Sequence, residues 1–163
     1  MSVEAYIGVG SNLGDSLALC REAVDRMERS PGITVKAVSP WYRSRPVGVK
    51  DEQNWYVNVV VLLETALSPR DLLEALLGIE AGMGRVRKKR WESRLIDLDL
   101  LLYGAERICM DGLEIPHPRM HLRKFVLLPL SDLAPDLVPP GMDSPVREFL
   151  ERLDDKGQDV LRI

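Results

Sequence analysis

Two aspartates separated by a single residue, Asp97 and Asp99, stand in an otherwise apolar stretch of the sequence. Side chains two apart on a β-strand point to the same face, so both carboxylates would lie on one face, roughly 7 Å apart along the strand. Such a pair repels itself and loses hydration, and a hard divalent cation offsets both effects. Mg²⁺ typically takes one or two carboxylates and leaves its other positions to water and substrate phosphates. The pair indicates an Mg²⁺ site, and pairing with nearby arginines is the alternative.

A cluster of basic residues leads directly into this pair, although the whole chain carries a net charge of −3. Runs of charge are usually solvated loops, but here the cations would stand beside a metal site. Guanidinium groups bind phosphate oxygens in bidentate fashion, and a triphosphate with Mg²⁺ needs both cations and carboxylates. Trp91, in the middle of the cluster, would either close over a nucleotide or pack locally. The cluster comprises Arg85, Arg87, Lys88, Lys89, Arg90 and Arg94.

The hydrophobic pattern predicts the elements that must position these groups. The segments 3–9, 33–42, 56–63 and 96–103 are typical of strands, and 108–115 of a hairpin around Asp111-Gly112. Helices are expected from Ser16, from Ser68-Pro69 to Gly82, over 125–133 and after Ser144-Pro145. The order β-α-β, β-α-β with short connections predicts an α+β fold, a ferredoxin-like sandwich with helices on a mixed, mainly antiparallel sheet.

Length and composition bound the class of protein. A chain of 163 residues with 45 % hydrophobic and 29 % charged residues is typical of one globular domain, which we expect to span 1–163. It has no apolar run long enough for a transmembrane helix, and its acidic balance disfavours nucleic-acid or membrane binding. Two distant cysteines suit neither a disulfide scaffold nor a CxxC zinc site. We expect a reduced cytoplasmic protein, of a size that fits a monomer.

Several familiar motifs are absent. There is no GxxxxGK[ST] P-loop, and Leu13 stands at the third glycine position of a would-be GxGxxG. His117 and His121 are four residues apart, but Pro116 and Pro118 argue against a helix that would bring them together on zinc. No arrangement of Ser, His and Asp indicates a covalent nucleophile.

One combination of motifs resembles a known family. The block R-x-R-x-x-R-W-x-x-R-x-x-D-x-D runs over residues 85–99 and is followed by Pro116-His117 and Arg123-Lys124-Phe125. Upstream stand Gly-Ser-Asn-Leu-Gly at 10–14, Tyr-Arg-Ser at 42–44 and Tyr-Val-Asn at 56–58. Together they resemble the 6-hydroxymethyl-7,8-dihydropterin pyrophosphokinase family, from about residue 6 to about residue 139. The fold of that family is also a ferredoxin-like sandwich.

The resemblance implies a folate-biosynthesis enzyme that transfers pyrophosphate from ATP to the hydroxymethyl group of the pterin and releases AMP. Matched by position, Asp97 and Asp99 would hold two Mg²⁺ ions, and Arg85 and Arg94 would contact the triphosphate or gate its access. The nucleotide side would comprise Glu80, Arg87, Trp91, His117 and Arg123. The pterin ring would lie between Tyr56 and Phe125, with Asn58 at its edge and backbone groups near Ser44 and Val47.

The chain departs from the family pattern at Ser93, where proline is usual, at Pro118, where an aromatic often follows the histidine, and at Lys124, usually a small residue. None of these positions is an expected metal ligand or aromatic clamp. Two other functions are weighed against the kinase. A metal-dependent nucleic-acid-binding or nuclease module would use the basic cluster and the aspartates, and a ligand-sensing ferredoxin-like domain would lack catalysis.

Overall fold

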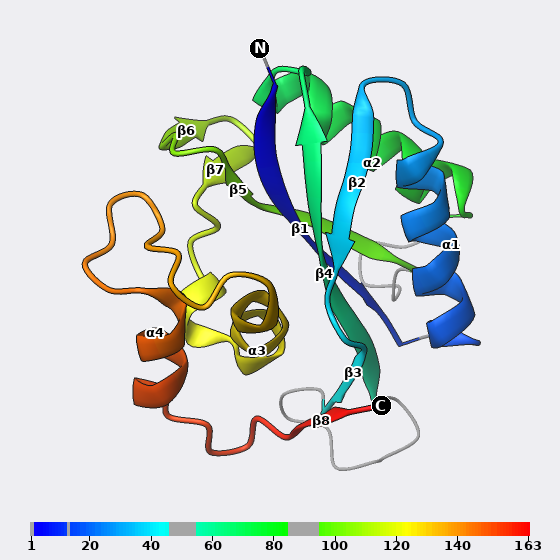
Figure 1. The fold of residues 1–163 in the computed structure, drawn as a ribbon. Helices are drawn as coiled ribbons and strands as arrows, with labels where there is room; N and C mark the ends of the chain where they lie inside the picture. The colour runs from blue at the N-terminus through cyan, green and yellow to red at the C-terminus, as the bar shows by residue number, and fades with distance from the viewer. Residues whose placement is uncertain (1, 13, 46–54, 85–94) are drawn as a thin grey trace.

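The computed structural model describes residues 2–12, 14–45, 55–84 and 95–163. Within this part of the chain, the main sheet has six strands and every pairing is antiparallel. The strand order is β5-β1-β4-β3-β8, and β2 pairs with the part of β4 that β3 leaves free (Figure 1). The strands are β1 (Val3–Ser11), β2 (Ile33–Val38), β3 (Tyr42–Ser44), β4 (Tyr56–Thr65), β5 (Asp97–Tyr103) and β8 (Val160–Arg162).

Helices cover both faces of this sheet, as Figure 1 shows. One face carries α1 (Ser16–Glu28) and α2 (Pro69–Gly82), and the other carries α3 (Lys124–Leu133) and α4 (Val146–Arg152). A hairpin of β6 (Ile108–Met110) and β7 (Leu113–Ile115) leads to a 3₁₀ turn, η2 (Met120–Leu122). The α+β sandwich expected from the sequence is therefore confirmed.

The first helices begin where their capping residues predict. Ser68 Oγ accepts the amide of Asp71 at 3.1 Å, and Pro69 occupies the first helical position, where its missing N–H costs nothing. Asp15 caps α1 in the same way by accepting from the amide of Ala18. These caps anchor the two helices whose apolar stripes pack on the same face of the sheet.

Two strands differ from expectation. The segment expected as one strand over 33–42 is split by a turn at Ser39–Trp41 into β2 and β3, both pairing with β4. The strand β8 was not expected, because Val160–Arg162 shows no long alternating pattern. It forms by pairing with β3, so a tertiary contact decides it.

The pairing of β1 and β5 shifts register at Tyr6/Ile7. This shift changes the sheet face on which the side chains at the end of β5 lie. Leu98 and Leu100 pack beneath α1 and α2, whereas Leu101 and Leu102 both pack with α3 and α4. The simple alternation that places Leu102 with Leu98 is wrong for this reason. No helix among the described residues is long and apolar enough to cross a membrane.

Candidate active site

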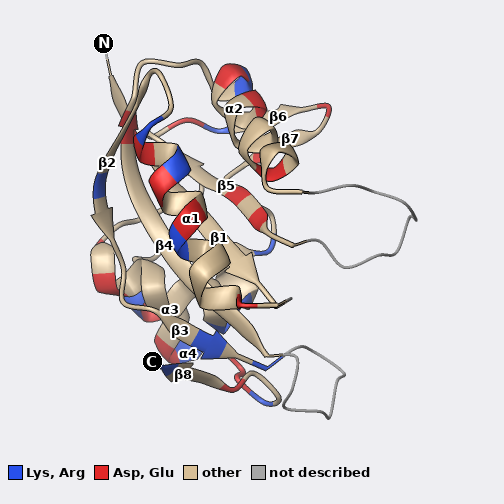
Figure 2. Cartoon of the chain, turned by 90° about the vertical axis from the view of Figure 1, so that its right-hand side faces the viewer, with Lys and Arg blue, Asp and Glu red and all other residues tan. Residues whose placement is uncertain are grey.

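The two aspartates of β5 lie on the sheet face that carries α3. Asp97 is opposite Gly10 and Asp99 is opposite Gly8 in the β1–β5 register, and all four line one cavity of about 560 Å³. Figure 2 shows the acidic positions of β5 in red on the strand. Because the facing positions on β1 are glycines, their backbone forms the cavity floor and leaves room for both carboxylates. The two aspartates therefore lie on one face of the strand, as the alternation of side chains predicts.

Residues from three other elements complete this cavity, which we call the main cavity. Tyr56 and Asn58 come from β4, Ser44 from β3, and Arg123 and Phe125 from the start of α3. The aromatic rings thus reach the cavity from separate elements, one from the sheet and one from the helix above it. A flat ligand inserted between sheet and helix would meet apolar ring surface on either side.

Asn58 is buried in a strand of valines, and its amide has a defined orientation. Ser44 Oγ donates to Asn58 Oδ1. The oxygen thus lies on the Ser44 side and Nδ2 lies toward Gly10, where a Cβ would be 3.1 Å from it. The Nδ2 donor therefore stands at the wall of the main cavity, where it can bind an acceptor on the edge of a heterocycle.

Charge is not uniform around the main cavity. The guanidinium of Arg123 lies over the Phe125 ring, 5.7 Å from its centroid, so an aromatic ring and a cation are joined at the start of one helix. Across the cavity, burial and the nearby charge of Asp97 raise the pKa of Tyr56 above its ordinary value. Tyr56 is thus a neutral phenol at physiological pH, and it adds no anion beside the two carboxylates.

His117 belongs to a second cavity of about 390 Å³, which shares Asp99 with the main cavity. Its amide donates to the Leu101 carbonyl at 3.0 Å, which fastens the loop after β7 to β5. Its Nδ1 accepts from the amide of Arg119, so the proton of the neutral ring is on Nε2. Burial lowers the pKa of His117, with a smaller opposing effect from Asp99. The ring is a neutral N–H donor.

The second cavity has aliphatic side chains along much of its wall. Its walls come from α2, β5 and the β6–β7 hairpin. Such a surface suits an uncharged aromatic ring, with the polar groups gathered at the Asp99 end. The apolar wall residues are Leu73, Leu98, Leu100, Met110 and Leu113.

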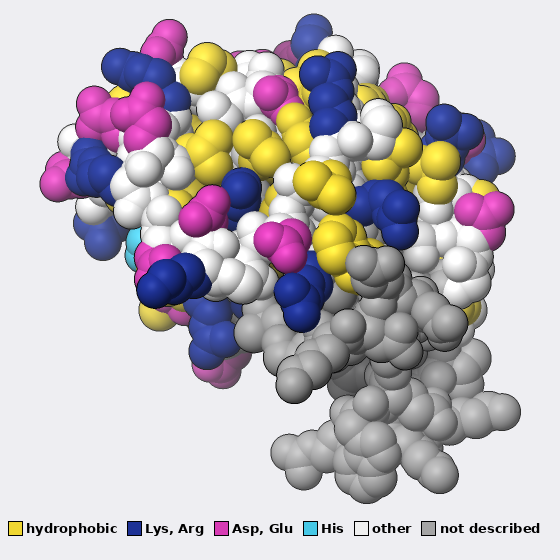
Figure 3. All heavy atoms as spheres, turned by 90° about the horizontal axis from the view of Figure 1, so that it is seen from below, with side chains coloured by type: hydrophobic (Ala, Val, Ile, Leu, Met, Phe, Trp, Pro, Cys, Tyr) yellow, Lys and Arg dark blue, Asp and Glu magenta, His cyan; other side chains and the backbone are white. Residues whose placement is uncertain are grey.

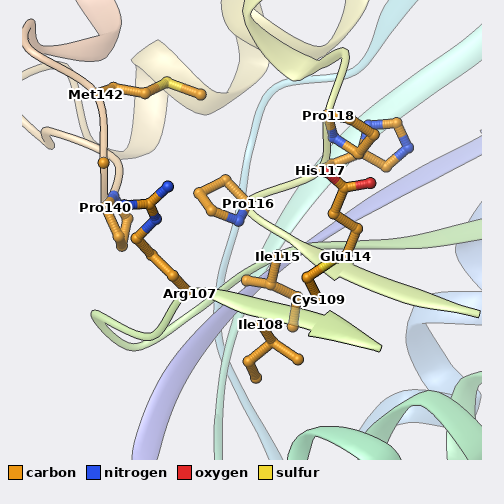
Figure 4. A pocket seen from close by; sticks show the side chains of 11 residues that line it. Arg107, Ile108, Cys109, Glu114, Ile115, Pro116, His117, Pro118, Pro140 and Met142 are labelled. Carbon is orange, nitrogen blue, oxygen red and sulfur yellow. The ribbon is translucent and has the colours of Figure 1, made fainter. Parts of the chain in front are cut away.

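A third cavity, of about 490 Å³, adjoins the second and shares His117 and Pro118 with it (Figure 4). Pro116 stands at its centre, Arg107 and Pro140 close one side, and Glu114 lies beside His117 on the other. It shares no residue with the main cavity. The carboxylate pair and the aromatic rings therefore belong to a different hollow.

The carboxylate pair fits a magnesium ion better than a fully protein-bound metal. Among the described residues, no group of three or more His, Cys, Asp or Glu side chains could hold a metal. A closed structural zinc site needs four such ligands, whereas Mg²⁺ keeps several positions for water and phosphate oxygens. Asp97 and Asp99, side by side at the wall of a large cavity, supply the kind and number of ligands that Mg²⁺ takes from a protein.

The structure brings together seven of the side chains expected from the sequence in the main cavity and places His117 next to it. Glu80 is elsewhere: it is buried in the last turn of α2 and is not among the described residues that line either cavity. Val47, Arg85, Arg87, Trp91 and Arg94 lie outside the described residues. The seven in the main cavity are Ser44, Tyr56, Asn58, Asp97, Asp99, Arg123 and Phe125.

Sequence reasoning missed Gly8 and Gly10 as parts of the site. The strand expected over 3–9 ends before Gly10, yet Gly10 is within β1, where it pairs with both Asn58 and Asp97. The signal was available, because glycine inside a strand often marks a close approach of a ligand or another backbone.

Known proteins resemble this chain along most of its length. A family model described as "7,8-dihydro-6-hydroxymethylpterin-pyrophosphokinase (HPPK)" matches residues 6–135. The 2-amino-4-hydroxy-6-hydroxymethyldihydropteridine pyrophosphokinase of Methylorubrum extorquens is 46% identical over 153 residues, covering 94% of this chain and 95% of that protein. Its counterpart from Pseudomonas aeruginosa is 45% identical over 146 residues, covering 89% of this chain and 90% of that protein.

Among solved structures, the Plasmodium falciparum HPPK-DHPS with pteroate superimposes with a TM-score of 0.76 at 14% identity. That match covers 93% of this chain but only 42% of the other, so this chain spans less than half of that longer protein. At such low identity the likeness concerns the fold. The family match and the two bacterial relatives, taken with the main cavity, lead to one conclusion: the chain belongs to the 7,8-dihydro-6-hydroxymethylpterin-pyrophosphokinase family.

Proposed function

We propose that the main cavity and the second cavity together form the active site at which this chain carries out its family's reaction. In that reaction the pyrophosphoryl group of ATP moves to the hydroxymethyl group of 6-hydroxymethyl-7,8-dihydropterin, and AMP leaves. The observation that carries the proposal is the composition of the main cavity. Two carboxylates, an oriented amide and two aromatic rings from separate elements converge on one hollow.

The pterin fits the main cavity. Tyr56 and Phe125 offer ring surface from β4 and α3, and stacking between them would hold a planar heterocycle. The amide of Asn58, oriented by Ser44, donates from Nδ2 to an acceptor on the ring edge. A buried donor that finds its partner only in the correct heterocycle gives specificity, because an analogue lacking the acceptor leaves that donor unpaired.

The nucleotide fits the second cavity, with its phosphates toward Asp99. The apolar walls of that cavity suit the adenine ring, and His117 offers its Nε2 proton at the polar end. A triphosphate extended from there reaches Asp99, which both cavities share, and then Arg123 at the main cavity. The acceptor hydroxyl and the β-phosphate would thus meet at the carboxylate pair.

The chemistry required of the protein is mainly positioning and neutralisation of charge, because the transferred group is strongly anionic. Asp97 and Asp99 would hold Mg²⁺, two ions by the family pattern. The metal would neutralise phosphate charge and acidify the attacking hydroxyl. The Arg123 guanidinium and the His117 N–H act on phosphate oxygens directly. Tyr56, kept neutral, leaves the carboxylates as the anionic groups facing the metal.

Formation of AMP tests this function. Purified protein with ATP and Mg²⁺ is expected to release AMP only when 6-hydroxymethyl-7,8-dihydropterin is added. Turnover is expected to stop when the metal is chelated and to return with added Mg²⁺. Release of AMP without the pterin, or its absence in every mixture, contradicts the proposal.

The same preparation tests the nuclease alternative through cleavage or retention of DNA. That alternative needs a continuous basic surface. On the face seen in Figure 3, basic and acidic side chains of the described residues are interspersed. Because the whole chain also carries a net charge of −3, we expect neither cleavage nor retention.

We infer that residues 1–163 act as a single domain, since α4 and β8 pack on elements that build the site. We also propose that the chain acts as a monomer, which fits its length of 163 residues. A reaction that consumes ATP would take place in the cytoplasm. Sedimentation at micromolar concentration tests the monomer.

A further inference from the structure

The C-terminal segment, residues 154–163, reaches both walls of the main cavity. Its strand β8 pairs with β3, with Val160 opposite Ser44. Its Gln158 contacts the start of α3, which carries Phe125. Figure 1 shows the segment, in red, passing from α4 beneath the molecule to the edge of the sheet. The family match ends at residue 135, so this segment lies outside it.

Gln158 accepts a hydrogen bond from a free backbone amide at the start of α3. The first amides of a helix have no partner within it, and a capping side chain usually supplies one. The N-cap residue of α3, Arg123, makes no side-chain capping bond. Instead Gln158 Oε1 accepts the amide of Lys124 at 2.9 Å, from 34 residues away. The cap of this helix is therefore supplied by the C-terminal segment.

The same side chain also fastens the turn before α3. Gln158 Nε2 donates to the Leu122 carbonyl at 3.2 Å and to the Asp154 carbonyl at 3.1 Å. Both ends of the Gln158 amide are thus used, one on each side of Arg123. Because Arg123 and Phe125 lie directly beside these contacts and both line the main cavity, their positions depend on where Gln158 holds the chain.

The next residues of the segment hold the opposite wall. The Asp159 carbonyl accepts the amide of Arg45 at 2.9 Å, and the amide of Ile163 donates to the Trp41 carbonyl at 2.9 Å. These bonds hold β3 on the side away from β4. The Ser44 hydroxyl, which orients Asn58, is carried by that strand.

We propose that the C-terminal segment positions the pterin-binding walls, with Gln158 as a positioning residue for Arg123 and Phe125. This inference rests on the proposed function of the main cavity. The second cavity is built from α2, β5 and the β6–β7 hairpin, and the segment makes no hydrogen bond to the described part of these elements. Loss of the Gln158 contacts therefore acts mainly on the pterin, with a smaller effect on ATP through Arg123, because the walls proposed for the adenine ring are held by other elements.

Steady-state kinetics of Gln158→Ala tests the inference. The KM for 6-hydroxymethyl-7,8-dihydropterin is expected to rise roughly five- to tenfold, the effect of losing a helix cap, while the KM for ATP stays within about twofold. Asp155→Ala is the matched control. Asp155 also contacts Lys124, but through the Lys124 ammonium, at 3.1 Å, and not through its amide. The side chain of Asp155 is 61% exposed. This control is expected to behave as the parent chain.

Gln158→Glu separates capping from a general structural role. A carboxylate still accepts the Lys124 amide at the positive end of the helix, but it no longer donates to the Leu122 and Asp154 carbonyls. The pterin KM of this variant is expected to lie closer to the parent than to Gln158→Ala. Equal rises in both KM values, an unchanged pterin KM in Gln158→Ala, or no difference between the two variants overturns the inference.

The parent chain separates this failure from failure of the proposed function. A parent chain without pterin-dependent AMP release overturns the proposed function, and this inference with it. A fully active parent with an indifferent Gln158→Ala variant overturns this inference alone.

Discussion

The two faces of the central strands differ sharply, although successive residues of the same strands supply both faces. Beneath α1 and α2, β1 presents Ile7 and Val9 and β4 presents Val59, all at most 3% exposed. On the face that carries α3, the same strands present Gly8, Gly10 and Asn58. One face is filled with aliphatic side chains and the other holds a cavity. The period of two in a strand thus lets one backbone support stability and chemistry at once.

The functional face is itself divided along its length. Toward α4 it is closed by a second apolar cluster that includes Val60, Leu101 and Leu127. Toward β3 and the start of α3 it opens into the main cavity. Asp97, Asp99 and Leu101 follow one another on this face of β5, so one strand passes from the site into packed core within a few residues. Side chains at the site are therefore backed by a rigid support.

The largest effect is expected from the carboxylates. Asp97→Asn and Asp99→Asn each preserve shape but remove a negative charge that a metal needs. We expect kcat/KM for pterin turnover to fall by about 10²-fold or more, with the free energy of unfolding within about 1 kcal/mol of the parent. Kinetics and urea unfolding measure the two quantities. Asp111→Asn, an exposed change on the β6–β7 turn, serves as control. Retention of activity within tenfold by either variant contradicts the metal role.

The opposite face is expected to show the reverse pattern. Leu63 is fully buried beneath α1 and α2, and Leu63→Ala is expected to cost about 2–5 kcal/mol of unfolding free energy. The KM values measured well below the unfolding midpoint are expected to stay unchanged. Leu62→Ala, at the half-buried neighbouring position, should cost less. A specific rise in the pterin KM in Leu63→Ala would break the distinction between the faces.

A smaller effect is expected from filling the floor of the main cavity. A Cβ at Gly10 would lie 3.1 Å from Asn58 Nδ2, tight enough to displace that amide. Gly10→Ala is therefore expected to weaken pterin binding roughly tenfold, as overpacking does elsewhere. At Gly8 the nearest atoms are those of Leu101 at 3.6 Å, an ordinary contact. Gly8→Ala should weaken binding less, and calorimetric titration with the pterin compares the two. An equal loss in both variants argues against the role of Asn58.

The smallest effect concerns a polar bridge on the functional face. The Tyr42 hydroxyl donates to Asp132 of α3, and burial with this contact raises the pKa of Tyr42 to about 12. The folded state therefore favours the neutral phenol, whose contribution is complete below the ordinary pKa of 10 and is lost as pH rises from 10 toward 12. The parent chain should lose stability over this range more steeply than Tyr42→Phe. Urea unfolding at several pH values measures the slopes, and parallel slopes refute the bridge.

Much of the site was predictable because it depends on short-range patterns. Asp97 and Asp99 share a face because side chains alternate on any strand, whatever the fold around it. The cap at Ser68 was equally local, whereas the cap that Asp15 supplies to α1 was not predicted. Residues expected in one site, such as Tyr56 and Phe125, lie 69 positions apart in the chain, and the family resemblance rather than any spacing brought them together.

Other parts depended on contacts that no local pattern encodes. The strand β8 exists because β3 offers it an edge, and Gln158 caps α3 across 34 residues. Leu102 changes face because β1 and β5 shift register at Tyr6/Ile7. Glu80 is buried in α2 and is not among the described residues that line these two cavities, so its nucleotide contact stays a prediction.

By itself, the sequence determined the order of the elements, the capped helix starts and the placing of two carboxylates on one strand face. It did so because backbone geometry repeats every two residues in a strand and helix ends need nearby partners. Only the tertiary structure decided that glycines of β1 face those carboxylates, that Ser44 orients Asn58, and that the C-terminal segment holds both walls. These features arise from pairings between distant segments, whose geometry is set when the sheet and helices pack together.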